Sequence, residues 1–303
     1  SLVGSEMCIR DRVISTGEAY SGLFGAIYQA RVTRVVLAED CEIRTSYYGG
    51  GVVAYAQESE IVSCENRASV SFEGPAGYVG GIAGYVALAS SIDRCENLGI
   101  VTGTVQPSDN YASCLVYAGG IAGVNQESAI INSSNHAVVA VEALPEYDSC
   151  AGGIVGYNSG SSTFIANCYN AAGVRLSGSG FAGGILSYTD NGDVRVANCY
   201  NVGTVSGVPG KSYPIVPILS ADSEDCYYLT NCVEGEGSYA GTALTVDYMK
   251  STAFAARLND WSKTNNSSET GRQTLYWKVE DAENDGYPVF TDQDPGYTGV
   301  ASV

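Results

Sequence analysis

Short apolar runs of four to six residues alternate with glycine, asparagine and serine along most of the chain. These runs lack the 3.6-residue period of an amphipathic helix, and runs of this length between turn residues predict short β-strands. Most of them lie near a glycine pair or its degenerate copy, whose second glycine is Gly22, Gly51, Gly81, Gly120, Gly153 or Gly184. Successive copies are 29 to 39 residues apart, which indicates an internal repeat.

A second motif follows five of the glycine pairs after 13 to 15 residues. It centres on a small residue, usually cysteine, with an asparagine two positions later and a valine six positions later. The central residues are Cys64, Cys95, Ser133, Cys168 and Cys199, and the asparagines are Asn66, Asn97, Asn135, Asn170 and Asn201. Successive units therefore carry like residues at like positions, in columns.

A unit of this kind cannot bury its own apolar face, whereas stacked units can. The repeat therefore predicts an all-β fold, a right-handed parallel β-solenoid (β-helix) of six to seven coils over residues 13–232. A β-propeller is the alternative repeat fold. It is less favoured because propeller blades usually have about 40 residues or more and four strands.

The repeat resembles a known family at residues 152–158, Gly-Gly-Ile-Val-Gly-Tyr-Asn, and at residues 166–170, Ala-Asn-Cys-Tyr-Asn. These two runs are similar to the GLUG repeat of bacterial surface proteins, a repeat that also occurs beside immunoglobulin A1 protease sequences. The resemblance covers about residues 20–230. It implies an extracellular, cell-wall-associated β-helix-like region. The zinc motif that the related protease would need is absent from this sequence.

The two ends of the chain depart from the repeat. Residues 2–12 resemble the in-frame translation of a transposon-type sequencing adapter, so residues 1–12 are excluded from fold reasoning. We accordingly expect this chain to be part of a larger native protein. Residues 240–291 predict an α+β cap over the end of the solenoid, with a helix at 246–261 after an N-cap at Thr245 and a strand at 275–279. Residues 292–303 have the composition of a linker.

Charge and composition exclude several classes of function. The chain has 15 Lys+Arg against 33 Asp+Glu, a net charge of −18, which argues against nucleic-acid binding and against an anionic membrane surface. The sequence contains no run of about 18 apolar residues, so it predicts no membrane-spanning segment. The single histidine, His136, excludes any site built on several imidazoles, and a lone histidine is usually structural or exposed. We expect no metal and no cofactor.

The columns themselves have structural interpretations. One cysteine in each coil forms a row, not the tetrahedral cluster that zinc needs, so we interpret the cysteines as small buried residues. The asparagines are expected in turns with left-handed backbone, or as an amide ladder between coils. The glycine pairs are expected where a tight corner or a close approach of coils leaves no room for a side chain.

Two insertions emerge from the same corner of consecutive coils, at residues 106–113 and 142–149. Each contains a proline, a carboxylate and a tyrosine, and insertions on one face of a repeat protein are often its binding face. We expect the two loops to lie side by side and to bind a host glycan or a surface protein. The candidate binding residues are Asp109, Tyr111, Glu146, Tyr147 and Asp148, and Cys114 and Cys150 are a candidate disulfide.

The sequence thus favours a non-catalytic extracellular surface module of a bacterium, either adhesin-like or a scaffold, and no catalytic residue is assigned. Two alternatives stay open. One is a carbohydrate-active enzyme of the β-helix type, a polysaccharide lyase or a glycoside hydrolase, with paired carboxylates on one face of the rod. The other is a passive structural spacer.

Overall fold

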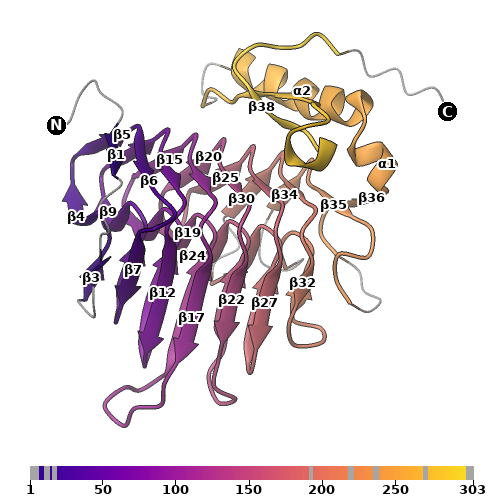
Figure 1. Cartoon of the computed structure of the whole chain (residues 1–303). Helices are drawn as coiled ribbons and strands as arrows, with labels where there is room; N and C mark the ends of the chain where they lie inside the picture. The colour runs from indigo at the N-terminus through magenta and orange to yellow at the C-terminus, as the bar shows by residue number, and fades with distance from the viewer. Residues whose placement is uncertain are drawn as a thin grey trace.

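A computed structural model describes residues 7–9, 14–15, 19–190, 194–217, 222–234, 239–268 and 272–297. The chain winds into a parallel β-solenoid in which successive coils stack along one axis (Figure 1). A full coil has five strands, and each strand belongs to one of five parallel sheets that run along the rod. The all-β parallel solenoid of about six coils predicted from the repeat is confirmed.

The chain visits the sheets of each coil in the order C, D, E, A and B. Sheet C contains β3 (Tyr20–Ser21), β8 (Tyr48–Gly50), β13 (Ala76–Gly80), β18 (Leu115–Gly119), β23 (Ser149–Gly152), β28 (Gly180–Gly183) and β33 (Ser212–Tyr213). Sheet D contains β4 (Phe24–Tyr28), β9 (Val53–Gln57), β14 (Ala83–Ala87), β19 (Ala122–Gln126), β24 (Val155–Ser159) and β29 (Leu186–Thr189). Sheet E contains β5 (Arg31–Thr33), β10 (Glu60–Val62), β15 (Ser91–Asp93), β20 (Ala129–Ile131), β25 (Thr163–Ala166), β30 (Val194–Ala197) and β34 (Asp222–Glu224).

The remaining two sheets complete the coil. Sheet A contains β1 (Met7–Ile9), β6 (Val35–Leu37), β11 (Glu65–Asn66), β16 (Glu96–Asn97), β21 (Ser134–Asn135), β26 (Tyr169–Asn170), β31 (Tyr200–Asn201), β35 (Tyr227–Leu229) and β36 (Thr242–Leu244). Sheet B contains β2 (Ile14–Ser15), β7 (Glu42–Thr45), β12 (Ser69–Gly74), β17 (Val101–Val105), β22 (Val139–Glu142), β27 (Val174–Ser177) and β32 (Val205–Ser206). Two-residue strands such as β11 and β16 are too short to form an apolar run, which is why the sequence pattern predicts fewer strands in each coil.

The strand register places each column of the repeat in line along the rod. In sheet E, for example, Ile61, Ile92, Ile130, Ile165 and Val196 pair in succession. All five side chains are fully buried. The apolar face that one unit cannot bury alone is therefore covered by the units on either side, as expected for a solenoid.

The asparagine column forms a buried amide ladder. The first four side-chain amides each donate one hydrogen bond to the next asparagine at 2.8–2.9 Å, and the last one donates to Cys232 Sγ. Each amide donates a second hydrogen bond to the backbone oxygen two residues later. The ladder runs through Asn66, Asn97, Asn135, Asn170 and Asn201, all fully buried. Both amide hydrogens are thus satisfied inside the rod, which burial of a polar group requires.

The glycine pairs lie directly against this ladder. A Cβ atom on Gly81 would come within 2.2 Å of Asn97 Cγ, and one on Gly153 within 2.5 Å of Asn170 Cγ. At the corner itself, a Cβ on Gly80 would lie 2.1 Å from the oxygen of Ala83. The glycine and asparagine columns are therefore two sides of one interior layer, which has no room for a side chain on the glycine side.

Left-handed backbone occurs one residue before the cysteine column and not in the asparagine column, which corrects the expected turn position. The φ angles lie between 49° and 56° at Ser63, Arg94, Asn132, Asn167 and Asn198. The cysteine column that follows is buried, and Ser133 makes the same bonds as its neighbours. Its hydroxyl accepts from Cys95 N at 3.1 Å, as Cys95 Sγ accepts from Cys64 N at 3.4 Å.

After the last coils the chain forms a segment of different structure, called here the C-terminal segment. It contains α1 (Val246–Met249), α2 (Thr252–Ser267), β37 (Tyr276–Lys278), a 3-10 turn (Asn284–Gly286) and β38 (Val289–Thr291), with β37 and β38 antiparallel. The single helix predicted at 246–261 is two helices, because Ser251 leaves the helical conformation and caps α2 through Phe254 N. In the described parts of the chain, neither helix is long and apolar enough to cross a membrane.

Of the cap expected over residues 240–291, β36 pairs with β35 at the end of sheet A, and the C-terminal segment lies along the side of the coils (Figure 1). Phe254 and Trp277 pack against three tyrosines of sheet A, and hydrogen bonds fasten the segment to three successive coils. These bonds join Leu275 N to Asn132 Oδ1, Trp277 Nε1 to Asn167 Oδ1 and Asn198 Nδ2 to Leu258 O, at 2.8, 2.8 and 3.2 Å. We call Asn132, Asn167 and Asn198, whose side chains bond to the C-terminal segment, the clamp asparagines.

The structure describes only part of the expected adapter remnant, residues 1–12, and of the expected linker, residues 292–303. Met7–Ile9, inside the expected adapter remnant, forms β1 beside β6, and the other residues of 1–12 lie outside the described residues. The expected linker is packed as far as residue 297. Asp292 forms an ion pair with Arg94 at 3.1 Å, and Asp294 forms one with Lys263 at 2.9 Å. Residues 298–303 lie outside the described residues.

Candidate functional site

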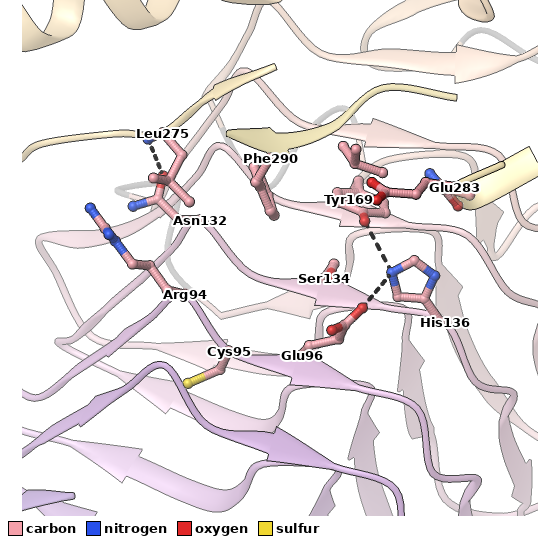
Figure 2. A pocket seen from close by; sticks show the side chains of 12 residues that line it. Arg94, Cys95, Glu96, Asn132, Ser134, His136, Tyr169, Leu275, Glu283 and Phe290 are labelled. Atoms are coloured by element: carbon pink, nitrogen blue, oxygen red, sulfur yellow. Dashed lines mark hydrogen bonds and ion pairs between the residues drawn. The ribbon is translucent and has the colours of Figure 1, made fainter. Parts of the chain in front are cut away.

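A pocket of about 500 Å³ lies where sheet A passes under the C-terminal segment (Figure 2). We call it the crevice. The solenoid contributes Arg94, Glu96, Asn132, Ser134, His136 and Tyr169 to its lining, and the C-terminal segment contributes Leu275, Glu283, Asn284, Val289 and Phe290. Its volume is in the range of ordinary ligand pockets, which often form at the junction of two structural units.

The crevice exists because the outward side of sheet A changes along the rod. One register position is occupied in successive coils by Glu65, Glu96, Ser134, Tyr169, Tyr200 and Tyr227. The tyrosines are buried under the C-terminal segment, whereas the two glutamates remain partly exposed. The cover ends near the coil of Ser134, and the step between covered and open surface forms the crevice.

His136 is the centre of the polar groups in the crevice. Its Nε2 lies 3.0 Å from the hydroxyl of Tyr169 and 3.2 Å from Glu96 Oε1, and its side chain is 19% exposed (Figure 2). Because Glu96 and Tyr169 come from the coils on either side of His136, the stacking of coils brings the three together. The sequence gives no sign of a role for His136, since its partners are 40 and 33 residues away in the chain.

Burial shifts the protonation of these groups toward their uncharged forms. It lowers the pKa of His136 below its usual value, because the imidazolium is partly desolvated. Burial also raises the pKa of the Glu96 carboxyl, and the neighbouring Glu65 raises it further. A single ring nitrogen either donates or accepts a hydrogen bond, so His136, Glu96 and Tyr169 compete for one proton position. A ligand that bonds to one of them therefore influences all three.

The chemistry of the crevice fits a polar ligand with one flat apolar face. Phe290 gives an aromatic wall, and Arg94 and Glu96 give planar hydrogen-bonding groups, whereas the Asn132 amide is already bonded to Asp93 and Leu275. Arg94 is held in place by Asp292 at 3.1 Å. In the described residues, no group of three or more histidine, cysteine or acidic side chains is arranged to hold a metal ion. Cys95 also lines the crevice, and burial holds its pKa well above the usual range, so it is a neutral thiol.

The two predicted binding loops leave the solenoid at the same corner of neighbouring coils. They connect β17 to β18 and β22 to β23, and both project beyond the ends of these strands (Figure 1). Asp109, Tyr111 and Glu146 are exposed, with Tyr111 44% exposed. The structure therefore leaves these three side chains open to a ligand, and none of them lines the crevice.

The other two predicted loop residues have partners within the protein. Asp148 forms an ion pair with Lys211 at 2.9 Å and accepts a hydrogen bond from the hydroxyl of Ser179. Tyr147 is partly buried against the core. Among the described residues no ring contact joins Tyr147 to Tyr111. The loops are neighbours, and of the five predicted residues three are exposed and two contact other parts of the protein.

The candidate disulfide between Cys114 and Cys150 is contradicted. Both cysteines are buried and neither forms a disulfide. In the register of β18 and β23, Cys150 pairs with Tyr117, which lies three residues beyond Cys114 along the strand. Three residues of strand span about 10 Å, which exceeds the Cα separation that a disulfide allows. Cys150 lies instead in an outward column of sheet C that consists mainly of aromatic residues.

Two rows of tyrosines on sheets C and D form a second surface that the sequence analysis missed. We call them, with Phe181, the tyrosine stripe. It consists of Tyr20, Tyr48, Tyr78, Tyr117 and Phe181 on sheet C and Tyr55, Tyr85, Tyr157 and Tyr188 on sheet D. A signal was present, because most of these rings stand three residues before or four residues after the second glycine of a pair.

No family model matches the sequence, and no curated protein matches it. Among solved structures, the chain is similar to a protein from Bacteroides ovatus described as a putative immunoglobulin A1 protease. The two are 19% identical, with a TM-score of 0.52 over 89% of this chain and 87% of that one. A second structure, named IgA1 protease, is 13% identical over 70% of this chain and 16% of its own length, with a TM-score of 0.49. At such low identity the first likeness shows a shared solenoid fold.

Proposed function

We propose that this chain is a non-catalytic module of an extracellular bacterial surface protein and that it binds a sugar residue of a host glycan in the crevice. The crevice carries this proposal. It combines the aromatic wall of Phe290 with Arg94, Glu96 and His136, and this combination matches a sugar ring, which has an apolar face and many hydroxyl groups.

Four observations support an extracellular location. The repeat resembles that of bacterial surface proteins, and a protein of similar fold is described as an immunoglobulin A1 protease. The net charge of −18 suits a chain that stays soluble outside the cell. The nine cysteines from Cys41 to Cys232, whose side chains the structure describes, are buried, which protects their thiols from oxidation without disulfides.

The crevice is a better candidate than the loops for the same ligand. A pocket shields hydrogen bonds from water, whereas Asp109, Tyr111 and Glu146 lie on exposed loop tips. The two alternatives, a carbohydrate-active enzyme and a passive spacer, make different predictions. His136 beside Glu96 has the groups for proton transfer, so an enzyme would use the same crevice and release product.

Binding to a glycan array, followed by titration calorimetry with the glycans that bind, tests the proposal. We expect Glu96→Gln to weaken binding by about tenfold or more, because a hydrogen bond to a charged group is worth about 1.5–3 kcal/mol. Glu60→Gln is the matched control, since Glu60 is an exposed glutamate on sheet E and lies outside the crevice lining. It should bind as the unchanged chain does.

Three outcomes contradict the proposal. Release of reducing ends or unsaturated sugars from a bound polysaccharide, abolished by Glu96→Gln, shows an enzyme. Binding that survives Glu96→Gln but is lost with Tyr111→Ala moves the site to the loops. Absence of binding to every glycan in the array supports the passive spacer.

A further inference from the structure

The rings of the tyrosine stripe form an unbroken chain of contacts along the rod. Neighbouring ring centroids are 4.4–6.0 Å apart, with the planes stacked or tilted. The chain passes through Tyr20, Tyr48, Tyr78, Tyr117, Tyr157, Tyr188 and Phe181. A second row joins it edge-on, for example Tyr85 against Tyr78 at 5.4 Å. The stripe therefore continues over most of the coils.

The stripe stays continuous where the repeat loses two of its aromatic residues. Val124 takes a tyrosine position on sheet D, and Cys150 takes one on sheet C. Tyr117 of sheet C then stacks on Tyr157 of sheet D in the next coil, at 4.4 Å and 18°. The aromatic path crosses from one sheet to the other at this point instead of ending.

Stacking leaves the ring edges and the hydroxyl groups for contact with a ligand. The tyrosines from Tyr48 to Tyr188 are partly exposed. Burial and neighbouring hydroxyls raise the pKa of Tyr48 and Tyr78 well above the usual range, so these groups remain neutral hydrogen-bond donors. Amides lie beside them, since Tyr55 donates to Gln57 Oε1 at 3.2 Å and Tyr85 donates to Gln126 Oε1 at 3.0 Å.

Charged side chains of both signs lie beside the stripe, and the Asp190 carboxylate acts on Tyr85 and Tyr117 as well as on Tyr157. The Asp190 carboxylate is beside Tyr157, and Lys211 lies 4.7 Å from the centroid of Phe181. From Tyr48 to Tyr85 the rings contact one another and two of their hydroxyls bond to amides, with the Glu58 carboxylate bonded to Gln57 at the edge of the stripe. The net charge of −18 repels a polyanion from the chain as a whole.

We propose that the tyrosine stripe binds a neutral polysaccharide chain lying along the axis of the rod. A polysaccharide repeats hydroxyl groups and C–H surface along its length. The stripe repeats hydroxyls and ring edges once in each coil, at the inter-strand spacing of about 4.8 Å. The stripe shares no residue with the crevice, so this inference goes beyond the proposed function and either can fail without the other.

Affinity electrophoresis of the full chain in gels containing a soluble neutral polysaccharide tests the proposal. The gels contain β-glucan, mannan, galactan or xylan, and alginate serves as the anionic comparison. We expect retardation in at least one neutral gel and none in alginate. The double variant Tyr78→Phe with Tyr85→Phe keeps both rings and removes two hydroxyls. It should weaken binding by about tenfold, since each neutral hydrogen bond contributes modestly.

Controls separate this surface from the others. Tyr111→Phe removes a tyrosine hydroxyl outside the stripe, and Glu96→Gln alters the crevice, so both variants should be retarded as the unchanged chain is. An unchanged thermal unfolding midpoint in the double variant shows that the rings still stack. The proposal is wrong if no neutral gel retards the chain, if alginate retards it more, or if the double variant binds normally. Loss of binding with Glu96→Gln alone assigns the polysaccharide to the crevice.

Discussion

The coils that the C-terminal segment leaves open and the coils that it covers have different residues on the outer face of sheet A. They have the same kind of residues on its inner face. The outward position filled by Glu65 and Glu96 in the open coils is filled by Tyr169 and Tyr200 in the covered ones. The inward residue beside it is an asparagine in both regions, and Asn66 and Asn170 make the same bonds to the next asparagine along the rod. The interior of the repeat is therefore set by the stacking of coils, whereas its exterior is set by whatever packs against it.

The position before the cysteine column shows the same contrast. Its backbone is left-handed in both regions, as at Arg94 and Asn167. In the open coils the side chain there is an arginine or a serine, which reaches water. In the covered coils it is an asparagine, whose amide bonds to the C-terminal segment. The same left-handed backbone thus occurs both in coils open to water and in coils under the C-terminal segment, and only the side chain differs.

Trp277→Ala should have the largest effect on stability. It tests whether the C-terminal segment can detach while the solenoid stays folded. Trp277 is fully buried between Tyr200 and Phe290, and truncation of a buried tryptophan costs about 3–5 kcal/mol. We expect the C-terminal segment to detach while the coils remain folded. Limited proteolysis should then cut near residue 240 and leave a stable core. Global unfolding would show instead that the solenoid needs its cover.

Two asparagines three residues apart give the next comparison, one in the interior ladder and one in the clamp. Asn135→Ala leaves several buried partners without hydrogen bonds, at a cost on the order of 3 kcal/mol in chemical denaturation. Asn132→Gly removes the clamp amide but keeps the left-handed backbone. It should speed hydrogen exchange at the Leu275 amide and leave the coils intact. Equal losses from both changes would contradict the distinction between interior and exterior.

Ser133→Cys should change the free energy of unfolding by no more than about 1 kcal/mol. Ser133 is the exception in the cysteine column, and it lies between the open and covered coils. Its hydroxyl makes the bonds that the neighbouring thiols make, so a cysteine completes the column. Thermal unfolding measures the change. A loss of several kcal/mol would mean that this coil needs the hydroxyl specifically.

Protonation of His136 should change the free energy of unfolding less than the preceding substitutions do. Its pKa is lowered in the folded chain, so the unfolded chain takes up the proton first as the pH falls. Stability is therefore lost as the pH falls below about 6.5, the unfolded value. Glu96 acts in the opposite sense at lower pH, because its pKa is raised. His136→Gln should lose less stability than the unchanged chain between pH 7.5 and 5.5, measured by denaturant titration. Identical profiles would contradict the burial of this ring.

The interior of the fold was predictable because its causes are local and repeated. Gly81 and Asn97 stand 16 residues apart and recur with nearly the same spacing, so their columns predict stacked coils before any contact is known. The tyrosine stripe was also visible as a column, at Tyr55 and Tyr85. The sequence does not show that the two rows meet at one corner, since this depends on which way each strand faces.

The crevice and its cover were not predictable from the pattern. Leu275 meets Asn132 across 143 residues, and nothing in either neighbourhood indicates this partner. The sequence analysis also placed the binding site on the loops, because insertions mark exposed surface. It could not show that Asp148 would pair with Lys211, 63 residues further on. Local patterns predict strands and columns, whereas sites here arise from contacts between distant segments.

The asparagine ladder has a consequence for how such a chain evolves. Each amide bonds to the next coil in the same geometry, so a coil that is duplicated or lost by recombination leaves two ends that still match. Among the open coils, gene duplication can therefore lengthen the rod without new solutions for its interior. The coils of Asn132, Asn167 and Asn198 do not have this freedom, because the C-terminal segment bonds to all three and an added coil would separate these bonds. We expect homologous rods to vary in length before Asn132 and to inherit the covered coils as one block.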